Sequence, residues 1–404
     1  MSDAGSLRAL AAAKLAEGRV AAAIRHARDY LQATGSPAPV VAHELRQPSQ
    51  AALGKGVSEI RVLEDADIPS TARLTDGLMQ YVHWSEAWRP PVLRVLALRD
   101  AAVLAPNLIV DAGGALLDDN IGFTNTKLCE FMPPDFNGIV AAGGRMLVAV
   151  RHRNVARVSE PALYLPTPGN YAAWLFGGLS RLAAYLSHAD CDELPIVLHG
   201  DVASYHLDAL RAMGIAQDRL RIHGAQVRLE CKALYYCTAS YLNHAPSATG
   251  VRFVRERVLA GLGAAADESS PQRIYLARRH AKDRPLQNES EVVALFERHG
   301  FVAIDPEQHS FEAQARFAAG AQVLAGPCGA NLANMMFARQ AQKLFVLATK
   351  YQPEFARLAS ALDIACWHTV PQSIELRKAR TLSEAYGYRA NLDDLERVLS
   401  DGLA

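Results

Sequence analysis

The chain has 404 residues, of which 50% are hydrophobic and 21% are charged. This composition is typical of a globular protein, and the length exceeds what one ordinary core can hold, so two domains are expected. Lysine plus arginine equals aspartate plus glutamate, at 42 each. A net charge of zero gives no general attraction to nucleic acid or to an acidic membrane, so any anion must be bound at a local site.

The sequence gives no signal for a membrane span or for secretion. No run approaches the roughly 18 apolar residues of a spanning helix, and the start MSDAGSLRAL lacks the basic and apolar regions of a secretory signal. The six cysteines are scattered and form no C-x-x-C pair, which favours buried thiols in a reducing compartment over disulfides or zinc. These features predict a cytoplasmic protein and leave peripheral association with the inner membrane open.

The first element in chain order is a helical hairpin, predicted for residues 1–36. Residues 6–34 carry apolar side chains at helical spacing, with a break at Gly18. One hairpin cannot bury its own apolar face, so it should pack on the main body or on a partner. TGSPAP at 34–39 then reads as a linker.

An N-terminal α/β domain is predicted for residues 40–246. Short apolar runs indicate strands up to about residue 160. From PTPGN at 166–170 the pattern alternates between helix and strand, beginning with a long helix in YAAWLFGGLSRLAAYLSHA and a strand in LPIVLHG. Such alternation is typical of a doubly wound fold.

A second, Rossmann-like α/β domain is predicted for residues 250–404, after a hinge within 247–270. Five strands with intervening helices, from RIYLARR to IACWHTV, predict a parallel sheet, and NLDDLERVLSDGL predicts a C-terminal amphipathic helix. Asn288 is expected to cap the helix NESEVVALFERHG, and Gly300 to end it. Two such domains predict a ligand-binding cleft between them.

The stretch GPCGANLANMMF has the form of an anion-binding turn. An apolar strand leads into a glycine-rich turn, which opens a helix whose first N–H groups can face a phosphate. Two asparagines three positions apart can face the same side. A plain strand–helix turn, with small residues chosen for packing, is the alternative. The residues predicted to bind a diphosphate or ribose here are Gly326, Pro327, Cys328, Gly329, Ala330, Asn331 and Asn334.

A basic cluster follows the strand RIYLARR and includes Arg278, Arg279 and Lys282. Cations at the carboxyl end of a parallel strand face the ligand crevice, and guanidinium groups bind phosphate in a bidentate manner. Neighbouring residues on a strand point opposite ways, so one of the two arginines should face the ligand. A solvated charged loop is the alternative.

These stretches resemble one known family. RIYLARR, NE before a helix, and GPCGANLANMMFA are similar in order and spacing to the C-terminal half of the family 61 glycosyltransferases, which carries IYISR, NE and GPHGAGLTNMLF. Upstream, PGNYAAWLFGGLSRL resembles the family's NYYHWLLDTLPRL, and YHLDALRAMGIAQDRL resembles its LLGI…DR stretch. The resemblance covers roughly residues 90–345.

The resemblance implies a GT-B architecture of two facing Rossmann-like domains and the inverting transfer of a hexose or pentose from a nucleotide sugar, a UDP-sugar by preference, to a saccharide. Bacterial members of the family act mostly in capsule and exopolysaccharide assembly. By analogy Arg278, Arg279, Asn288 and the turn 326–334 hold the nucleotide diphosphate. No cofactor and no nucleic-acid partner are implied, and a homo-oligomer or a protein complex stays open.

Three positions depart from the family pattern. Cys328 stands where the family has the histidine of GPHGA, Ala173 where it has the histidine of NYYHW, and Gly177 where an acidic residue falls. Three polar positions are thus small or apolar, which points either to a changed donor and base or to an inactive relative.

Inverting transfer needs a base for the acceptor hydroxyl and positive charge for the leaving diphosphate. Asp201, at the end of the strand VLHGD, is the predicted base, with His206 and Asp111 as alternatives. Each of these can instead be a cap, a turn residue or a core histidine, and Asp201 in particular could cap the helix at 203–214. No D-x-D pair occurs in the donor region, so no metal site is expected, and Asp118–Asp119 is predicted to be a turn.

Cys328 allows a different chemistry. A thiol at a helix N-terminus beside arginines is expected to have a lowered pKa and to be nucleophilic; filling the space of the family's imidazole is the simpler role. Three hypotheses follow: an active, metal-independent glycosyltransferase, a catalytically degenerate binding or scaffold protein of the same fold, and a Cys328-dependent enzyme.

Overall fold

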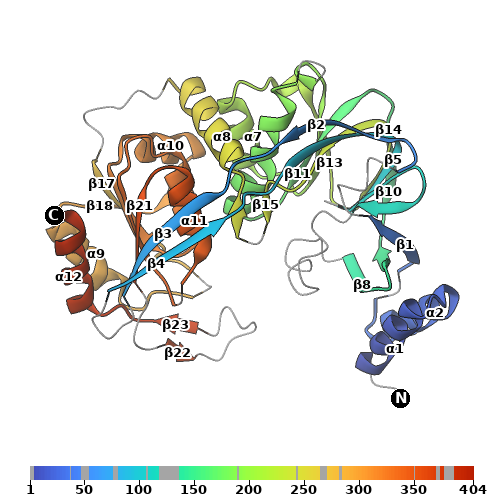
Figure 1. Ribbon diagram of the computed structural model, residues 1–404, viewed down its shortest axis with the longest axis horizontal. Helices are drawn as coiled ribbons and strands as arrows, with labels where there is room; N and C mark the ends of the chain where they lie inside the picture. The colour runs from blue at the N-terminus through green and yellow to red at the C-terminus, as the bar shows by residue number, and fades with distance from the viewer. Residues whose placement is uncertain are drawn as a thin grey trace.

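The computed structural model describes residues 4–36, 38–46, 54–75, 81–105, 108–117, 136–188, 191–242, 244–263, 271–281, 284–349, 351–369, 374–376 and 386–404. The predicted turn at Asp118–Asp119 and Lys282 of the basic cluster lie outside these ranges. The described chain is an α/β protein built on two large sheets, one at each end of an elongated molecule (Figure 1).

The predicted N-terminal hairpin is present as α1 (Ala4–Ala16) and α2 (Val20–Ala33). Gly18 joins the helices with φ 73°, a left-handed conformation that glycine adopts without strain. The hairpin packs on the main body: Arg8 donates from Nε to the Ile139 carbonyl at 2.9 Å. The shared apolar core contains Ala11, Leu15, Ala23, Ala27, Leu31, Ile139 and Leu147.

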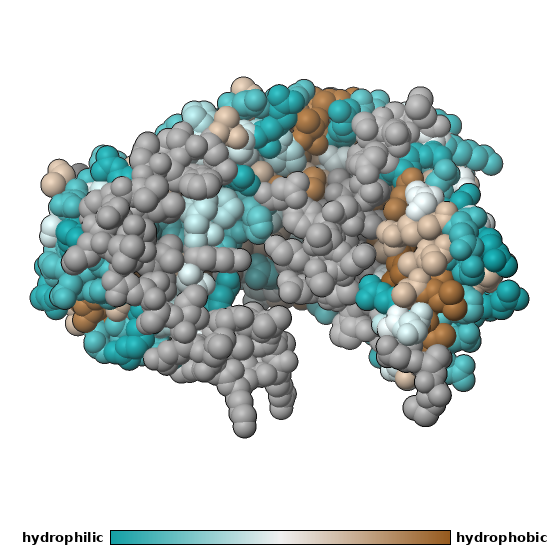
Figure 2. Space-filling view, turned by 60° about the horizontal axis from the view of Figure 1, so that its bottom comes forward, coloured by the Kyte–Doolittle hydropathy of each residue, from teal (hydrophilic) through white to brown (hydrophobic). Residues whose placement is uncertain are grey.

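The end of the molecule that carries this hairpin shows both polar and apolar residues on its surface (Figure 2). Leu10 of α1 is 39% exposed and Val41 of the following strand is 48% exposed. Among the described residues, no helix has the length and apolar character needed to cross a membrane.

The larger sheet has twelve strands and is mixed. Its main path runs β13-β12-β11-β14-β5-β6-β7-β1-β9-β8, with β10 paired to β14 and β2 paired to β5. The bounds are β1 Val40–Arg46, β2 Val57–Leu63, β5 Leu93–Ala105, β6 Leu108–Val110, β7 Ala115–Leu117, β8 Phe136–Ala142, β9 Arg145–Val150, β10 Asn154–Val158, β11 Ala162–Thr167, β12 Ile196–Gly200, β13 Leu220–His223 and β14 Val227–Cys237.

One part of this sheet is doubly wound. Strands β13, β12, β11 and β14 are parallel neighbours in that order, so the direction of winding reverses between β11 and β14. Between β12 and β13 lie α7 (Ser204–Ala212) and η4 (Gln217–Arg219), and β14 is followed by β15 (Tyr241–Leu242), β16 (Ala245–Pro246) and α8 (Ala248–Gly261), which lead to the second sheet.

The long helix predicted after β11 is irregular. It is divided into α5 (Tyr171–Ala173), a π-helical turn η1 (Trp174–Gly178), a 3₁₀ turn η2 (Leu179–Arg181) and α6 (Leu182–Tyr185). The Ser180 hydroxyl donates to the Leu175 carbonyl at 2.9 Å, replacing a regular backbone bond of the helix. A Cβ at Gly178 would lie 2.4 Å from the Trp174 ring, so this glycine lets the indole pack against the widened turn.

The second sheet runs β18-β17-β19-β20-β21-β3-β4. The five strands predicted from the C-terminal sequence are all present and parallel. Their bounds are β17 Arg273–Leu276, β18 Val302–Ile304, β19 Val323–Pro327, β20 Lys343–Leu347 and β21 Ala365–Thr369. The helices and remaining elements are α9 Glu289–Arg298, η5 Pro306–Gln308, α10 Phe311–Gly320, η6 Ala330–Phe337, α11 Pro353–Ala361, β22 Ile374–Leu376, β23 Tyr386–Tyr388 and α12 Leu392–Leu403.

Two strands of this sheet come from early in the chain. β3 (Ile68–Thr75) pairs in parallel with β21, and β4 (Tyr81–Trp88) pairs antiparallel with β3 (Figure 1). Residues 68–88 were expected in the N-terminal domain of residues 40–246, and that expectation is wrong for this segment. Local pattern identifies a strand but not its partner, because pairing is decided by contacts distant in sequence.

Candidate functional site

The first part of the site lies where the C-terminal sheet reverses its winding. In the order β18-β17-β19-β20-β21, the reversal falls between β17 and β19, and ligands of open α/β sheets bind outside the carboxyl ends of the strands at such a point. Arg278 follows β17, and Cys328 follows β19. The basic cluster and the glycine-rich turn predicted from sequence therefore meet at one place.

Arg278 bridges the two strand ends. Its backbone N–H donates to Glu289 Oε1 at 2.7 Å, and its guanidinium donates from Nη1 to the Cys328 carbonyl at 2.7 Å. Among the described residues this is the guanidinium's one hydrogen bond, which leaves several N–H donors for a phosphate. Arg279 is exposed.

Gly329 gives Arg278 its space. A Cβ at position 329 would lie 2.6 Å from both Cζ and Nε of Arg278. The φ of Gly329 is 172°, an extended conformation open to any residue, so the requirement for glycine is steric. Glycine here allows the guanidinium to lie flat over the turn.

The other residues of the turn hold it in place. A Cβ at Gly326 would lie 2.5 Å from the Leu276 carbonyl oxygen of the neighbouring strand, and Asn331 donates from Nδ2 to that same oxygen at 2.8 Å. The segment from Ala330 is a 3₁₀ helix, not the α-helix expected. Asn331 Oδ1 is buried with no partner among the described residues.

Asn334 connects the two halves of the protein. Its Nδ2 donates to Gln314 Oε1 at 2.9 Å and to the Asn331 carbonyl at 3.1 Å, and its Oδ1 accepts from the Tyr171 hydroxyl at 2.8 Å. Tyr171 comes from the start of α5, directly after β11. Asn334 is thus engaged within the protein, and the two motifs that carried the family resemblance touch.

The Asn288 side chain makes its hydrogen bonds with Ala390 and not with the turn at 326–334. Its Nδ2 donates to the Ala390 carbonyl at 3.0 Å, and its Oδ1 accepts from the Ala390 N–H at 3.0 Å. It stands at the N-cap position of α9 but makes no capping bond with its side chain, so the predicted cap is wrong. Both polar atoms of its amide fasten α9 to the segment before α12. The next residue, Glu289, supports the site instead by holding the backbone of Arg278.

The second part of the site comes from the larger sheet. Its winding reverses between β11 and β14, and the chain after β14 leads to Tyr241 and His244. His244 Nδ1 lies 2.7 Å from Glu354 Oε2 in the first turn of α11. The Tyr241 hydroxyl also lies near the Glu354 carboxylate and Cys328, which both raise its pKa. The reversal points of the two sheets therefore face each other, and we call Tyr241, His244, Cys328 and Glu354 the junction cluster.

Burial and neighbouring charges raise the pKa of one member of this cluster, Tyr241. Desolvation raises the pKa of the Tyr241 hydroxyl, and the neighbouring Glu354 carboxylate and Cys328 add to the rise, so Tyr241 stays protonated and can donate. Cys328 is 6% exposed. Three members of the cluster, Tyr241, His244 and Glu354, lie in no recognisable motif and could not be predicted from the sequence.

Two of the three departures from the family pattern border Tyr241. A Cβ at Gly177 would lie 4.0 Å from the Tyr241 Cβ, and Cys328 interacts with the same tyrosine. The third, Ala173, lies at the end of α5 and donates its N–H to Asn170 Oδ1 at 3.0 Å. Two of the three positions that lack the family's polar side chains, Gly177 and Cys328, thus adjoin Tyr241.

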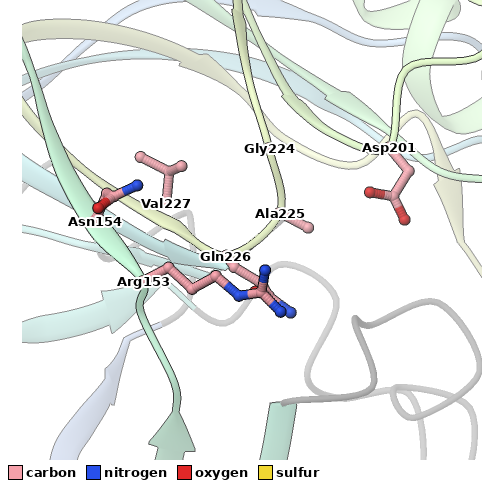
Figure 3. Close-up of a pocket in the computed structure, with 7 residues that line it drawn as sticks. All are labelled: Arg153, Asn154, Asp201, Gly224, Ala225, Gln226 and Val227. Atoms are coloured by element: carbon pink, nitrogen blue, oxygen red, sulfur yellow. The ribbon is translucent and has the colours of Figure 1, made fainter.

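Asp201 lines a different pocket, of about 360 Å³. Its carboxylate extends into the space beside Ala225, and the Arg153 guanidinium lies below them (Figure 3). The remaining lining residues are Asn154, Gly224, Gln226 and Val227. The N-cap of α7 is Ala203, so Asp201 does not cap that helix.

Three buried or half-buried histidines lie near this pocket. His199, at the end of β12, hydrogen-bonds through Nε2 to the Val227 carbonyl at 2.8 Å, at the start of β14. Burial lowers the pKa of His199 to about 4, and His223 and His152 contribute. These histidines are therefore neutral at physiological pH.

The two alternative bases have structural roles. His206 is fully buried, accepts at Nδ1 from the Ala203 N–H at 2.8 Å and donates from Nε2 to the Pro168 carbonyl at 3.0 Å. Asp111 is 4% exposed, accepts from the N–H groups of Gly113 and Ala115 through Oδ1, and pairs with Arg46 through Oδ2 at 3.2 Å. The structure therefore does not bring His206 or Asp111 to the site.

Within the described ranges, no group of three or more histidine, cysteine, aspartate or glutamate side chains is placed to hold a metal ion. Metal independence itself stays a prediction.

The glycosyltransferase 61 family model matches residues 81–345 of the chain, well over half its length. The chain belongs to this family. Membership confirms the resemblance found in the sequence and makes this family 61 protein a glycosyltransferase by class, with a sugar donor and an acceptor. The matched region includes Tyr171, Tyr241, His244, Arg278 and Cys328, whereas Glu354 lies beyond it.

A comparison with curated proteins found no match. Among solved structures, the iron-containing dodecameric heptosyltransferase TibC in complex with ADP-D-β-D-heptose is 10% identical, with 74% of this chain and 81% of that chain covered and a TM-score of 0.28. A second TibC structure, from enterotoxigenic E. coli H10407, gives the same identity and coverage with a TM-score of 0.30. Scores this low carry no inference about fold or function.

Proposed function

We propose that this family 61 protein transfers a sugar from a nucleoside-diphosphate sugar, a UDP-sugar by preference, to a hydroxyl of a saccharide acceptor, with inversion and without a metal. The two halves then form a GT-B arrangement, with the donor on the C-terminal sheet. A role in surface polysaccharide assembly, with or without association to a membrane or a second copy, belongs to the same proposal.

The observation that supports this most directly is the position of Arg278. Its guanidinium lies over Gly329 at the reversal point between β17 and β19 and is anchored to the Cys328 carbonyl at 2.7 Å. A fixed guanidinium beside the start of a helix suits a diphosphate, whose leaving charge must be neutralised when the sugar departs. With this charge supplied by the protein, the reaction requires no metal.

Transfer also needs a base on the acceptor side. Asp201 remains the base proposed from sequence, and its carboxylate is exposed in the pocket with Arg153.

A second candidate is a catalytically degenerate binding protein of the same fold. It is favoured by Cys328, Ala173 and Gly177, which replace polar family positions, two of them beside the junction cluster. This candidate predicts that nucleotide sugars bind without turnover. The Cys328-dependent enzyme has no such support, because the thiol is buried.

The test is nucleotide binding by calorimetry with UDP, GDP and ADP, combined with nucleoside diphosphate release from UDP- and GDP-sugars. A hydrogen bond to a charged group contributes about 1.5–3 kcal/mol, so Arg278→Ala should weaken the Kd roughly 10- to 150-fold. Arg298→Ala is the matched control, since Arg298 lies at the far end of α9 with its side chain 65% exposed. Equal affinities for the two variants, or no binding by the wild type, would refute the proposal.

A further inference from the structure

His244 and Glu354 form a dyad between the two halves of the protein. His244 lies after β14, at the reversal point of the larger sheet, and Glu354 lies in the first turn of α11, after β20 of the other sheet. The contact between Nδ1 and Oε2 is 2.7 Å. The pair exists only when both halves are assembled, as expected of a group that acts on a substrate bound between them.

The geometry prepares His244 to accept a proton. A carboxylate at Nδ1 fixes the proton on that nitrogen and leaves the lone pair on Nε2, as in other carboxylate–histidine pairs. Within the part of the chain that the structure describes, no hydrogen bond reaches Nε2, and the side chain is 37% exposed. The protonated Tyr241 hydroxyl lies near the same Glu354 carboxylate.

The backbone of His244 is strained. Its φ is 61°, a left-handed conformation that costs a non-glycine residue about 1–3 kcal/mol. Such strain persists only where the surrounding structure enforces it, and here it brings the imidazole to Glu354.

The dyad adjoins the donor site. Tyr241 lies near both Glu354 and Cys328, and the carbonyl of Cys328 accepts the hydrogen bond from Arg278. One residue, Cys328, thus lies between the guanidinium proposed to hold the diphosphate and Tyr241, the tyrosine beside the dyad. Gly177, where the family pattern carries an acidic residue, lies beside the same tyrosine.

We propose that His244, oriented by Glu354, is the catalytic base for the acceptor hydroxyl, in place of Asp201. The acceptor oxygen attacks the anomeric carbon of the donor sugar, and its proton passes to Nε2 of His244. The bond from the anomeric carbon to the phosphate oxygen breaks, and its electron pair leaves on the diphosphate, which Arg278 neutralises. Glu354 stabilises the imidazolium that results, so Glu354 is a positioning residue. This inference rests on the proposed transfer reaction.

Asp201 is the less suitable base because of its position. It follows β12, one strand away from the reversal point between β11 and β14. Its pocket is lined by segments around Arg153 and by residues 224–227, none of which contributes to the junction cluster.

The experiment measures nucleoside diphosphate release by the full chain from UDP- and GDP-sugars, with p-nitrophenyl glycosides as acceptors, and UDP affinity in parallel. A general base contributes roughly 10²- to 10⁴-fold, so His244→Gln should lower kcat by that factor while the Kd for UDP stays within a few-fold. Glu354→Gln should also lower kcat, because its amide donates to Nδ1 and forces the proton onto Nε2. In His244→Gly, added imidazole should restore part of the rate, which a purely structural role would not allow.

A matched control lies away from the junction, just before β18, the edge strand of the C-terminal sheet. His299, at the end of α9, pairs through Nε2 with Glu396 Oε1 at 2.8 Å, so His299→Gln removes an equivalent pair away from the junction and should leave kcat unchanged. Thermal unfolding of every variant separates loss of fold from loss of chemistry.

Two outcomes would overturn the inference. The first is His244→Gln turning over at the wild-type rate, and the second is Asp201→Asn losing turnover while His244→Gln keeps it. Failure of the proposed function looks different, because the wild type itself would then release no diphosphate from any donor, whether or not it binds UDP.

Discussion

Two glycines of one turn should respond in opposite ways to alanine. At position 329 the new Cβ meets the end of a flexible side chain, 2.6 Å from Arg278 Cζ. The guanidinium must retreat by about 0.8 Å to reach ordinary contact distance, which displaces it from the Cys328 carbonyl and from the proposed diphosphate. The fold should persist, because alanine is compatible with the extended backbone at this position. Alanine also lowers the conformational entropy of the unfolded chain, which stabilises the folded state by about 0.4–1 kcal/mol.

Gly329→Ala should therefore weaken nucleotide binding without unfolding the protein. If Arg278 contributes about 1.5–3 kcal/mol as a charge-assisted donor, the Kd for the nucleotide should rise by up to roughly 10- to 150-fold, toward the value of Arg278→Ala. In the double variant Gly329→Ala, Arg278→Ala, the second change should add little, because both remove the same interaction. Calorimetry with UDP measures this.

At position 326 the new Cβ meets backbone, 2.5 Å from the Leu276 carbonyl oxygen. No rotamer relieves that contact, so β17 and β19 must separate, at a cost of about 1–3 kcal/mol for overpacking. Gly326→Ala should lower the melting temperature by about 2–4 °C for each kcal/mol. The reasoning fails if Gly329→Ala binds UDP as tightly as the wild type while Arg278→Ala does not, or if both alanine variants lose the same stability.

Two further predictions concern the supports of the site. Tyr171→Phe removes the donor to Asn334 Oδ1 across the two halves and should lower the free energy of unfolding in urea by about 1–3 kcal/mol. The Tyr30 hydroxyl makes no hydrogen bond within the described residues, so Tyr30→Phe should leave the free energy of unfolding unchanged. Equal losses of stability in the two variants would contradict a hydrogen bond between the halves. Burial raises the pKa of Glu289 above 4.5, so its contribution to stability is present at low pH and lost as pH rises through the raised pKa. The unfolding free energy of the wild type minus that of Glu289→Gln should therefore fall as the pH rises from below 4.5 through the raised pKa, and a constant or rising difference would contradict it.

The features that could be predicted from the sequence depend on residues that lie close together along the chain. The helical hairpin, the five parallel C-terminal strands and the meeting of Arg278 with the turn at Gly326 follow from local periodicity and from the rule that parallel strands end at one edge. The predicted capping by Asn288 failed because a partner 102 positions away, Ala390, takes both atoms of its amide. Nothing near Asn288 in the sequence signals that competition.

The sequence by itself determined the family, the order of the elements and the arginine and glycines of the proposed donor site, because these depend on short motifs. Tertiary structure decided which sheet β3 and β4 join, that Tyr171 binds Asn334, and that His244 meets Glu354. The last contact spans 110 positions and joins segments without a motif. Only the apposition of the two reversal points brings that histidine and that glutamate together, and it follows from packing over the whole chain.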